Sequence, residues 1–367
     1  MGAAALKQSS RDTGLRDRIR RQLGDGGTAA MQLRKLADEG RLSGVVAVAL
    51  DDEMLFGGAY GMADRVKNVH NKLDTRFNVA SVSKMLTATA VARLAEQKRI
   101  SFEDSVTQHL TDLPAEFAPI LVHHVLSHRS GLGDYFNSPL WSAKLRRGGT
   151  TVSSYMEAVR QDRPAFTPGS AYAYSNNGFV LLGALIEKVT GTDYFTAVED
   201  LVYKPAGMHH TEHRLDTEVR PNDAVSYTTG CFRRPPSVCT PGPAEAFSIG
   251  IRGTPAAGAY STAGDLIKFA HSFRSGKVVG RPMLQTMKSW HVDNLPPGAP
   301  TQGYGYGLGL LRVGGHELFG HNGGTPGAGA QIDMLDDPGL TIVVLTNIDA
   351  VQREVSGLVR NALLTEV

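Results

Sequence analysis

The sequence predicts a mixed α/β (α+β) fold with one sheet built from strands at both ends of the chain. Apolar, β-branched runs of strand length occur within residues 44–60 and again within residues 305–347. Between them, the chain has the pattern of helices and loops, divided by proline and glycine. The two groups of strands therefore flank an inserted helical region.

The N-terminal part predicts a helix followed by a hairpin. Residues 11–21 form a basic, polar segment, which we interpret as a solvated face. Residues 28–40 carry apolar side chains at helical spacing. The run Gly44–Leu50, an acidic turn and residues 54–60 then predict two paired strands.

The middle of the chain predicts two buried helices. Residues 81–97 place small side chains on one stripe, which favours close packing, and residues 178–189 are strongly apolar. Residues 230–255 are rich in proline and predict a long surface loop near the site.

The C-terminal part returns the chain to the sheet. Strands are predicted over 305–313, 317–321, 327–335 and 340–347, and a closing helix over 350–364. We expect an α/β subdomain from residues 1–80 and 255–367, and a mostly helical subdomain from 81–254. The active site is expected in the cleft between them.

Composition excludes several classes of partner. The 38 basic and 36 acidic residues give a net charge of +2, so nothing indicates a nucleic-acid partner. No apolar run reaches the roughly 18 residues of a membrane span.

The first residues lack a signal-peptide core, so we expect a cytoplasmic protein, or an exported one whose leader has been removed. The oligomeric state is not indicated.

Two cysteines, Cys231 and Cys239, lie in the proline-rich segment. Their separation could close a small disulfide loop, which would indicate an oxidising compartment. Two unrelated free thiols fit the sequence equally well.

A single Ser-x-x-Lys motif, Ser81 to Lys84, occurs in the chain. Positions three apart share a helix face, so the hydroxyl and the amine could meet without help from the rest of the fold. A lysine can activate a serine if its surroundings favour the neutral amine. Alone, the motif also fits an N-cap serine followed by a solvated lysine.

Two further motifs follow in order: Tyr174-x-Asn176 and His321-x-Gly323. With these three motifs the chain resembles the serine β-lactamase and penicillin-binding-protein superfamily, in its class C β-lactamase-like and D-alanyl-D-alanine-carboxypeptidase-like branch. Residues 126–132, 183–191, 204–208 and 261–266 also resemble segments of that branch. The similarity runs from about residue 45 to the C-terminus.

The resemblance implies an antiparallel sheet covered by helices, beside an all-helical subdomain. It also implies a covalent acyl-enzyme and no cofactor or metal. Ser81 would be the nucleophile, and Lys84 with Tyr174 would move its proton as one coupled system. Asn176 would orient Lys84 and the acyl side chain of the substrate.

The resemblance further implies that the His321-x-Gly323 strand is an edge strand lining the cleft. Gly323 would let the substrate backbone approach closely. The N–H groups of Ser81 and Gly324 would form the oxyanion hole. His321 stands where typical β-lactamases carry the lysine of Lys-Thr-Gly, and a structural strand-end histidine is its alternative interpretation.

A second Tyr-x-Asn begins at Tyr135. Tyr174 follows a Pro-Gly turn and leads into an apolar helix, as the family motif does, so Tyr174 is preferred for catalysis. Tyr135 is kept as a candidate for the substrate cleft.

The difference between His321-x-Gly323 and the Lys-Thr-Gly motif of typical β-lactamases affects which substrate is expected. At His321 a titratable group replaces a fixed cation that would grip a carboxylate. This favours a carboxylesterase-like enzyme acting on a small ester, amide or peptide. The alternatives are a D-amino-acid-directed peptidase, a transpeptidase-like acyltransferase or penicillin-binding enzyme, and a non-catalytic binding or scaffold relative.

Other enzyme classes lack their signatures. The sequence has no Gly-x-Ser-x-Gly and no His-Glu-x-x-His. The histidine pairs at 123–124 and 209–210 lack partner ligands at metal spacing, so no metal is expected.

Overall fold

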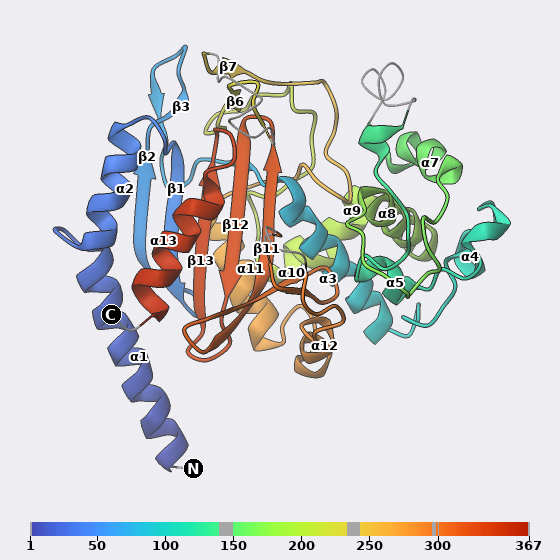
Figure 1. Cartoon of the computed structure of the whole chain (residues 1–367), viewed down its shortest axis with the longest axis horizontal. Coiled ribbons are helices and arrows are strands. Elements are labelled where there is room, and N and C mark those ends of the chain that lie inside the picture. The colour runs from blue at the N-terminus through green and yellow to red at the C-terminus, as the bar shows by residue number, and fades with distance from the viewer. Residues whose placement is uncertain (1, 139–149, 233–242, 296–298, 300, 366–367) are drawn as a thin grey trace.

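The computed structural model describes residues 2–138, 150–232, 243–295, 299 and 301–365. Its centre is a seven-stranded antiparallel sheet with the order β2-β1-β13-β12-β11-β10-β9 (Figure 1). The strands are β1 (Gly44–Leu50), β2 (Glu53–Tyr60), β9 (Gly303–Tyr304), β10 (Gly309–Val313), β11 (His316–Thr325), β12 (Ala328–Met334) and β13 (Leu340–Thr346). The two ends of the chain meet where β1 pairs with β13.

The central strands are apolar on both faces because each face is covered. Every residue of β1, β12 and β13 is buried. In β1, alternate residues enter different cores: Val46 and Val48 face one, and Val45 and Ala47 face the other. The sheet is therefore the middle layer of three.

One outer layer consists of α1 (Gly2–Leu23), α2 (Thr28–Asp38) and α13 (Gln352–Leu364). Both termini lie on this side, and the N-terminal end of α1 projects beyond the body of the molecule (Figure 1). The other layer begins with α3 (Ser83–Glu96) and α11 (Ala263–Ser275), which share a core with the sheet.

The helical region lies beyond α3 and contributes to the same core. Its helices are α4 (Val106–His109), α5 (Val122–Leu126), α7 (Val152–Gln161), α8 (Asn176–Thr190), α9 (Tyr194–Val198) and α10 (Lys204–Ala206), and α12 (Arg281–Met287) follows α11. α8 begins where the Ser175 side chain accepts the Gly178 N–H, and it ends at left-handed Gly191.

Short strands complete the fold. They are β3 (Met62–Asp64) with β4 (Val69–His70), β5 (Phe77–Asn78) with β8 (Tyr260–Ser261), and β6 (Tyr227–Thr228) with β7 (Glu245–Ala246). The β5–β8 pair holds the segment before Ser81 against residues 258–261.

The predicted fold class is confirmed, with three differences in its elements. The predicted helix at 81–97 begins as a 3-10 turn, η1 (Ala80–Val82), before α3. The predicted strand at 305–313 begins only at Gly309, as β10, because residues 305–308 form the turn that joins β9 to β10, where Gly307 adopts a positive φ of 67°. The predicted strand at 317–321 extends to Thr325 as β11.

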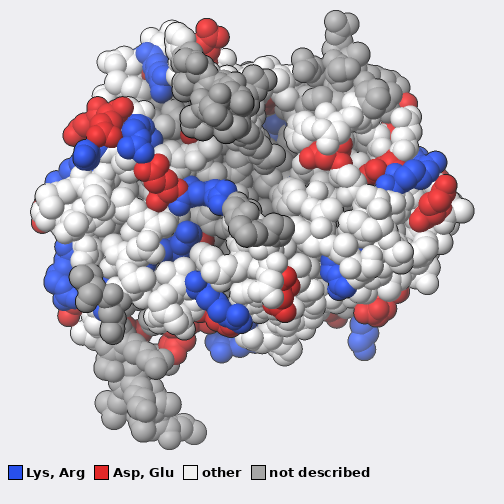
Figure 2. Space-filling view, in the orientation of Figure 1, with Lys and Arg blue, Asp and Glu red and all other residues white. Residues whose placement is uncertain are grey.

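The surface carries charges of both signs. Figure 2 shows acidic and basic side chains interspersed over one face, in keeping with the small net charge. In the part of the chain that the structure describes, no helix is both long and apolar enough to cross a membrane.

Candidate active site

Ser81 lies on a strained turn directly before α3. The preceding residue, Ala80, has a positive φ of 46°, which is rare for a residue with a side chain. Two hydrogen bonds hold this turn: the Asn78 Oδ1 accepts the Ala80 N–H at 2.8 Å, and the Ser83 Oγ donates to the Ala80 carbonyl at 2.7 Å. Such strain persists where the surroundings fix it, and it concentrates at functional sites.

Lys84 is completely buried one turn beyond Ser81. Its Nζ lies 3.4 Å from the Ser81 Oγ, 2.6 Å from the Asn176 Oδ1 and 2.7 Å from the Ala256 carbonyl oxygen. The carbonyl and amide oxygens can only accept hydrogen bonds, whereas a hydroxyl can accept or donate. The geometry therefore suits an ammonium that donates three bonds, and also a neutral amine whose lone pair faces the Ser81 hydroxyl.

Tyr174 lies on the open side of this pair. The Lys84 Nζ is 4.7 Å from the centre of the Tyr174 ring, and the side chain is 39% exposed. It reaches this place from the loop that leads into α8. The structure thus brings together the three residues predicted to be catalytic.

Asn176 joins the lysine to a carboxylate that the sequence analysis did not single out. Its Nδ2 donates to the Asp134 Oδ2 at 2.7 Å. Because a carboxylate only accepts, Asp134 fixes the amide so that its oxygen faces Lys84. The signal was present in the sequence, since Asp134 directly precedes the second Tyr-x-Asn motif.

Gly323 on β11 packs directly against the backbone of the Ser81 turn. A Cβ added to Gly323 would lie 2.5 Å from the Val79 carbonyl oxygen and 2.8 Å from the Ser81 nitrogen. Gly324 follows and lines the same cavity as Ser81. β11 is not an edge strand, but its pairing with β10 ends at Gly320, so its later residues are open towards Ser81.

His321 does not occupy the position expected of it. The ring is 2% exposed, and its Nε2 is hydrogen-bonded to the Tyr304 hydroxyl at 2.8 Å. Burial, and then the charge of Lys84, lower the pKa of His321 to about 3. The expectation of a titratable cation in the cleft is therefore corrected, because a buried neutral ring cannot grip a carboxylate there.

Tyr135 lines the cavity but is almost fully buried. Its hydroxyl lies 3.5 Å from the Thr254 Oγ1, and burial raises the pKa of Tyr135 well above its ordinary value. This supports the preference for Tyr174, which adjoins Lys84.

A cavity of about 610 Å³ opens from Ser81, a size typical of small-molecule sites. The lining includes large apolar side chains, which are Phe136, Phe232, Phe247, Ile249 and Ile251. The polar lining includes two carboxylates, Asp134 and Asp216.

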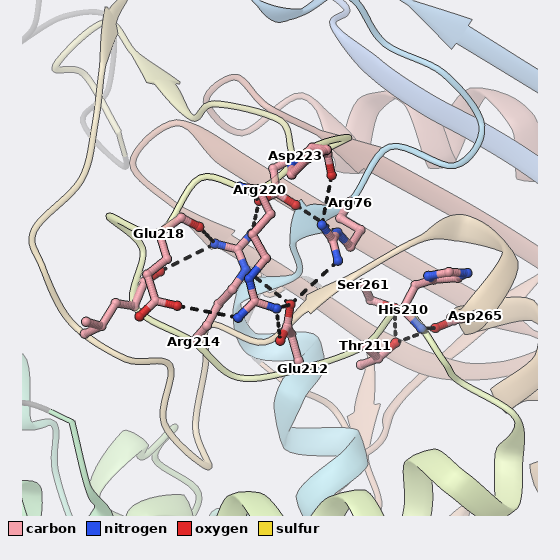
Figure 3. A network of polar contacts seen from close by, with 12 residues as sticks. Arg76, His210, Thr211, Glu212, Arg214, Glu218, Arg220, Asp223, Ser261 and Asp265 are labelled. Atoms are coloured by element: carbon pink, nitrogen blue, oxygen red, sulfur yellow. Dashed lines mark hydrogen bonds and ion pairs between the residues drawn. The ribbon is translucent and has the colours of Figure 1, made fainter.

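Arg214 is the only basic residue among the described residues that line this cavity. Its Nη2 lies 2.6 Å from the Asp223 Oδ2, and its guanidinium stacks 3.7 Å from the centre of the Tyr260 ring. Figure 3 shows how Arg76 and Glu212 extend this charge network. The positive charge at Arg214 is therefore balanced by the carboxylates of Asp223 and Glu212.

The predicted disulfide falls partly outside the described residues. Cys231 is disulfide-bonded, and Phe232 beside it lies against Gly324. Cys239, the other cysteine of the sequence, lies outside the described residues.

In the described ranges, no group of three or more His, Cys, Asp or Glu residues is arranged to hold a metal ion. The ring centres of His123 and His124 are 4.2 Å apart, but no third His, Cys, Asp or Glu among the described residues is arranged with them to hold a metal.

The sequence is similar to several characterised proteins. It is 26% identical over 332 residues to penicillin-binding protein 4* of Bacillus subtilis, covering 85% of this chain and 69% of that protein. It is 29% identical over 303 residues to esterase EstB of Burkholderia gladioli, covering 75% and 76%. It is 26% identical over 327 residues to the D-aminopeptidase of Brucella anthropi, covering 88% and 59%.

Solved structures share the fold. A penicillin-binding protein from Bacillus halodurans matches with a TM-score of 0.79 and 25% identity, covering 89% of this chain and 98% of that one. The D-amino acid amidase of Ochrobactrum anthropi SV3 matches with a TM-score of 0.76 and 25% identity, covering 92% and 97%. The family model described as Beta-lactamase matches residues 15–365. The resemblance inferred from the three motifs is thus confirmed, and the chain belongs to the beta-lactamase family of serine hydrolases and penicillin-binding proteins.

Proposed function

We propose that this protein cleaves esters or amides through a covalent acyl-enzyme on Ser81, with carboxylesters as its preferred substrates. One observation carries the proposal: the buried Lys84 amine contacts the Ser81 hydroxyl and two fixed acceptors, beside a cavity that Ser81 lines. A serine becomes a useful nucleophile when an adjacent base takes its proton.

Acylation begins with Lys84 in its neutral form. Its two N–H groups then donate to Asn176 and Ala256, so the lone pair faces the Ser81 hydroxyl. As the Ser81 Oγ attacks the substrate carbonyl carbon, the hydroxyl proton passes to Lys84, with Tyr174 beside it as a second proton carrier. The π electrons of the carbonyl move onto its oxygen.

The N–H groups of Ser81 and Gly324 are proposed to bind this oxyanion, and such donors each contribute about 3 kcal/mol. Collapse of the tetrahedral intermediate breaks the bond to the leaving alcohol or amine, which takes the proton held by the Lys84 and Tyr174 pair. A water molecule then attacks the acyl-enzyme and gives its proton to the same pair. Collapse of this second tetrahedral intermediate breaks the bond between the acyl carbon and the Ser81 Oγ, and the Oγ takes the proton back from the pair as the acid leaves.

The cavity supports the preference for esters over substrates with a terminal carboxylate. Its one described basic residue, Arg214, is paired with Asp223, and His321 is buried and neutral. The described lining of the cavity therefore holds no cation that is free to bind a carboxylate of the substrate. The large apolar side chains of the lining suit a hydrophobic acyl or leaving group.

A second candidate is a D-amino-acid-directed amidase or peptidase. Asp134 and Asp216 line the cavity and favour a substrate that carries an amine. Relatives named as a D-aminopeptidase and a D-amino acid amidase support this reading. A non-catalytic binding protein is the alternative of a different class.

The test compares kcat/KM for p-nitrophenyl esters of short acids, for D- and L-phenylalanine amides, and for nitrocefin. We expect the esters to be turned over fastest and Ser81→Ala to abolish turnover. Ser289→Ala is the control, because Ser289 is exposed and, among the residues that the structure describes, its hydroxyl bonds only to the Gln285 carbonyl. Faster turnover of a D-amide or of nitrocefin would reject the ester preference. Full activity in Ser81→Ala would reject the mechanism.

A further inference from the structure

His128 is a buried histidine beside the candidate active site that the sequence analysis left without a role. It lies between α5 and the short helix η3 (Tyr135–Asn137), with no exposed surface. Its φ is +58°, a left-handed conformation that few residues other than glycine adopt. Both features indicate a position whose side chain is held by specific contacts.

Two hydrogen bonds tie His128 to the residues on either side of Tyr174. The His128 carbonyl oxygen accepts the Ala173 N–H at 2.9 Å, and its Nδ1 accepts the Ser175 N–H at 3.1 Å. Its ring centre lies 4.3 Å from that of Tyr174. One residue therefore fixes the backbone on both sides of the tyrosine and contacts its ring.

This arrangement requires a neutral ring with its proton on Nε2. The Nδ1 can accept the Ser175 N–H only if it carries no proton itself. Burial, followed by the charges of Lys84 and His321, lowers the pKa of His128 well below its ordinary value. The surrounding rings of Tyr304 and Phe179 offer no opposite charge.

The other ring nitrogen argues against a purely space-filling role. The His128 Nε2 is buried and has no hydrogen-bond partner among the residues that the structure describes. An unpaired buried donor destabilises a fold. An apolar ring of similar size would fill the same space without this cost, so the contact made by Nδ1 is the feature that distinguishes histidine here.

We propose that His128 is a positioning residue that holds Tyr174 beside Lys84 and Ser81 for proton transfer. The inference rests on the proposed acyl-enzyme mechanism, and in it His128 itself transfers no proton during the reaction. His128 acts through the backbone on either side of Tyr174 and through contact with the Tyr174 ring.

Two variants separate the contributions of the ring. His128→Phe keeps an aromatic ring and removes the Nδ1 acceptor. His128→Asn removes the ring, places an acceptor near the former Nδ1, and tolerates a positive φ. Because misplacing a reacting group by about 1 Å costs about 10²-fold, we expect His128→Phe to lower kcat by about 10-fold or more, with KM little changed. His128→Asn is expected to retain more activity.

Combining these changes with Tyr174→Phe shows whether the loss of kcat depends on Tyr174, as a positioning role requires, or occurs regardless of Tyr174, as a purely structural role would. If His128 acts through Tyr174, His128→Phe should cost less than about twofold in the Tyr174→Phe background. An equal loss in both backgrounds, or wild-type kcat in a folded His128→Phe enzyme, would overturn the proposal.

The rate of fluorophosphonate labelling tests the role of His128 separately from the acyl-enzyme mechanism on which it rests. Wild-type protein that is not labelled at Ser81 would reject the mechanism. Labelling at Ser81 that is equally fast in the His128 variants would reject only the role of His128.

Wild-type protein provides a test that does not depend on variants folding. In ¹⁵N NMR from about pH 5 to pH 8, we expect His128 to stay neutral with its proton on Nε2. A protonated Nδ1 anywhere in this range would overturn the proposal.

Discussion

Replacing Gly323 by alanine tests how closely β11 must approach the nucleophile. The added Cβ would lie 2.5 Å from the Val79 carbonyl oxygen, 2.8 Å from the Ser81 nitrogen and 3.0 Å from the Ala80 Cβ. The first two distances fall about 0.9 Å and 0.6 Å short of an ordinary 3.4 Å contact. Both atoms belong to the backbone, so no side chain can rotate away.

Either β11 or the Ser81 turn must therefore shift by several tenths of an ångström. Both carry N–H groups assigned to the oxyanion hole, and loss of one such donor costs about 10²- to 10³-fold in kcat. We expect kcat/KM for p-nitrophenyl acetate to fall at least about 10²-fold in Gly323→Ala. The free energy of unfolding should fall by about 1–3 kcal/mol, as for other overpacked sites.

Gly357→Ala is the matched control. Gly357 lies in α13, and a Cβ there would come no closer than 3.7 Å to the Arg360 Nη2. Alanine in a helix interior is favoured over glycine by about 1 kcal/mol, so this variant should be active and no less stable. A Gly323→Ala enzyme with the activity and stability of Gly357→Ala would refute the proposed packing of β11 on the Ser81 turn.

Three further outcomes are expected. Lys84→Ala and Tyr174→Phe should each lower kcat about 10²-fold or more, and the double variant should be little worse than the poorer single one; additive losses would contradict their action as a unit. Asp134→Asn should lower kcat about 10-fold, because an amide no longer dictates which way the Asn176 amide faces; unchanged kcat would exclude this orienting role. Folded His321 stays neutral down to about pH 3, whereas the unfolded chain protonates it near its ordinary value. The unfolded state thus binds more protons below about pH 6.5, and stability falls as pH drops. In urea unfolding between about pH 6 and pH 4, His321→Gln should show a slope smaller by about 1.4 kcal/mol per pH unit, and an unchanged slope would contradict the buried neutral ring.

The sequence predicted the sheet because periodicity is set locally. The β-branched runs of β1 and β13 and the hairpin to β2 lie where the alternating and apolar patterns placed them. The order of strands and helices along the chain predicted one sheet built from both ends, but it did not predict that β1 pairs with β13, which joins residues about 300 apart.

The site was predictable where motif spacing determines geometry. Ser81 and Lys84 meet because three residues span one helical turn. The burial of His321 was not predictable, since it depends on Tyr304, which comes from a different strand. Asp134 and His128 act through loops whose hydrogen bonds join segments about 40 residues apart. The position of Asp134 before the second Tyr-x-Asn motif could draw attention to it, but local patterns do not show which residues Asp134 and His128 contact.

The central claim is that Ser81 forms the covalent intermediate. The most direct measurement is intact-mass analysis after exposure to a fluorophosphonate, followed by peptide mapping of the adduct. We expect one adduct on Ser81, absent from Ser81→Ala and formed much more slowly in Lys84→Ala. An adduct on any other residue, or undiminished labelling of Ser81→Ala, would contradict it.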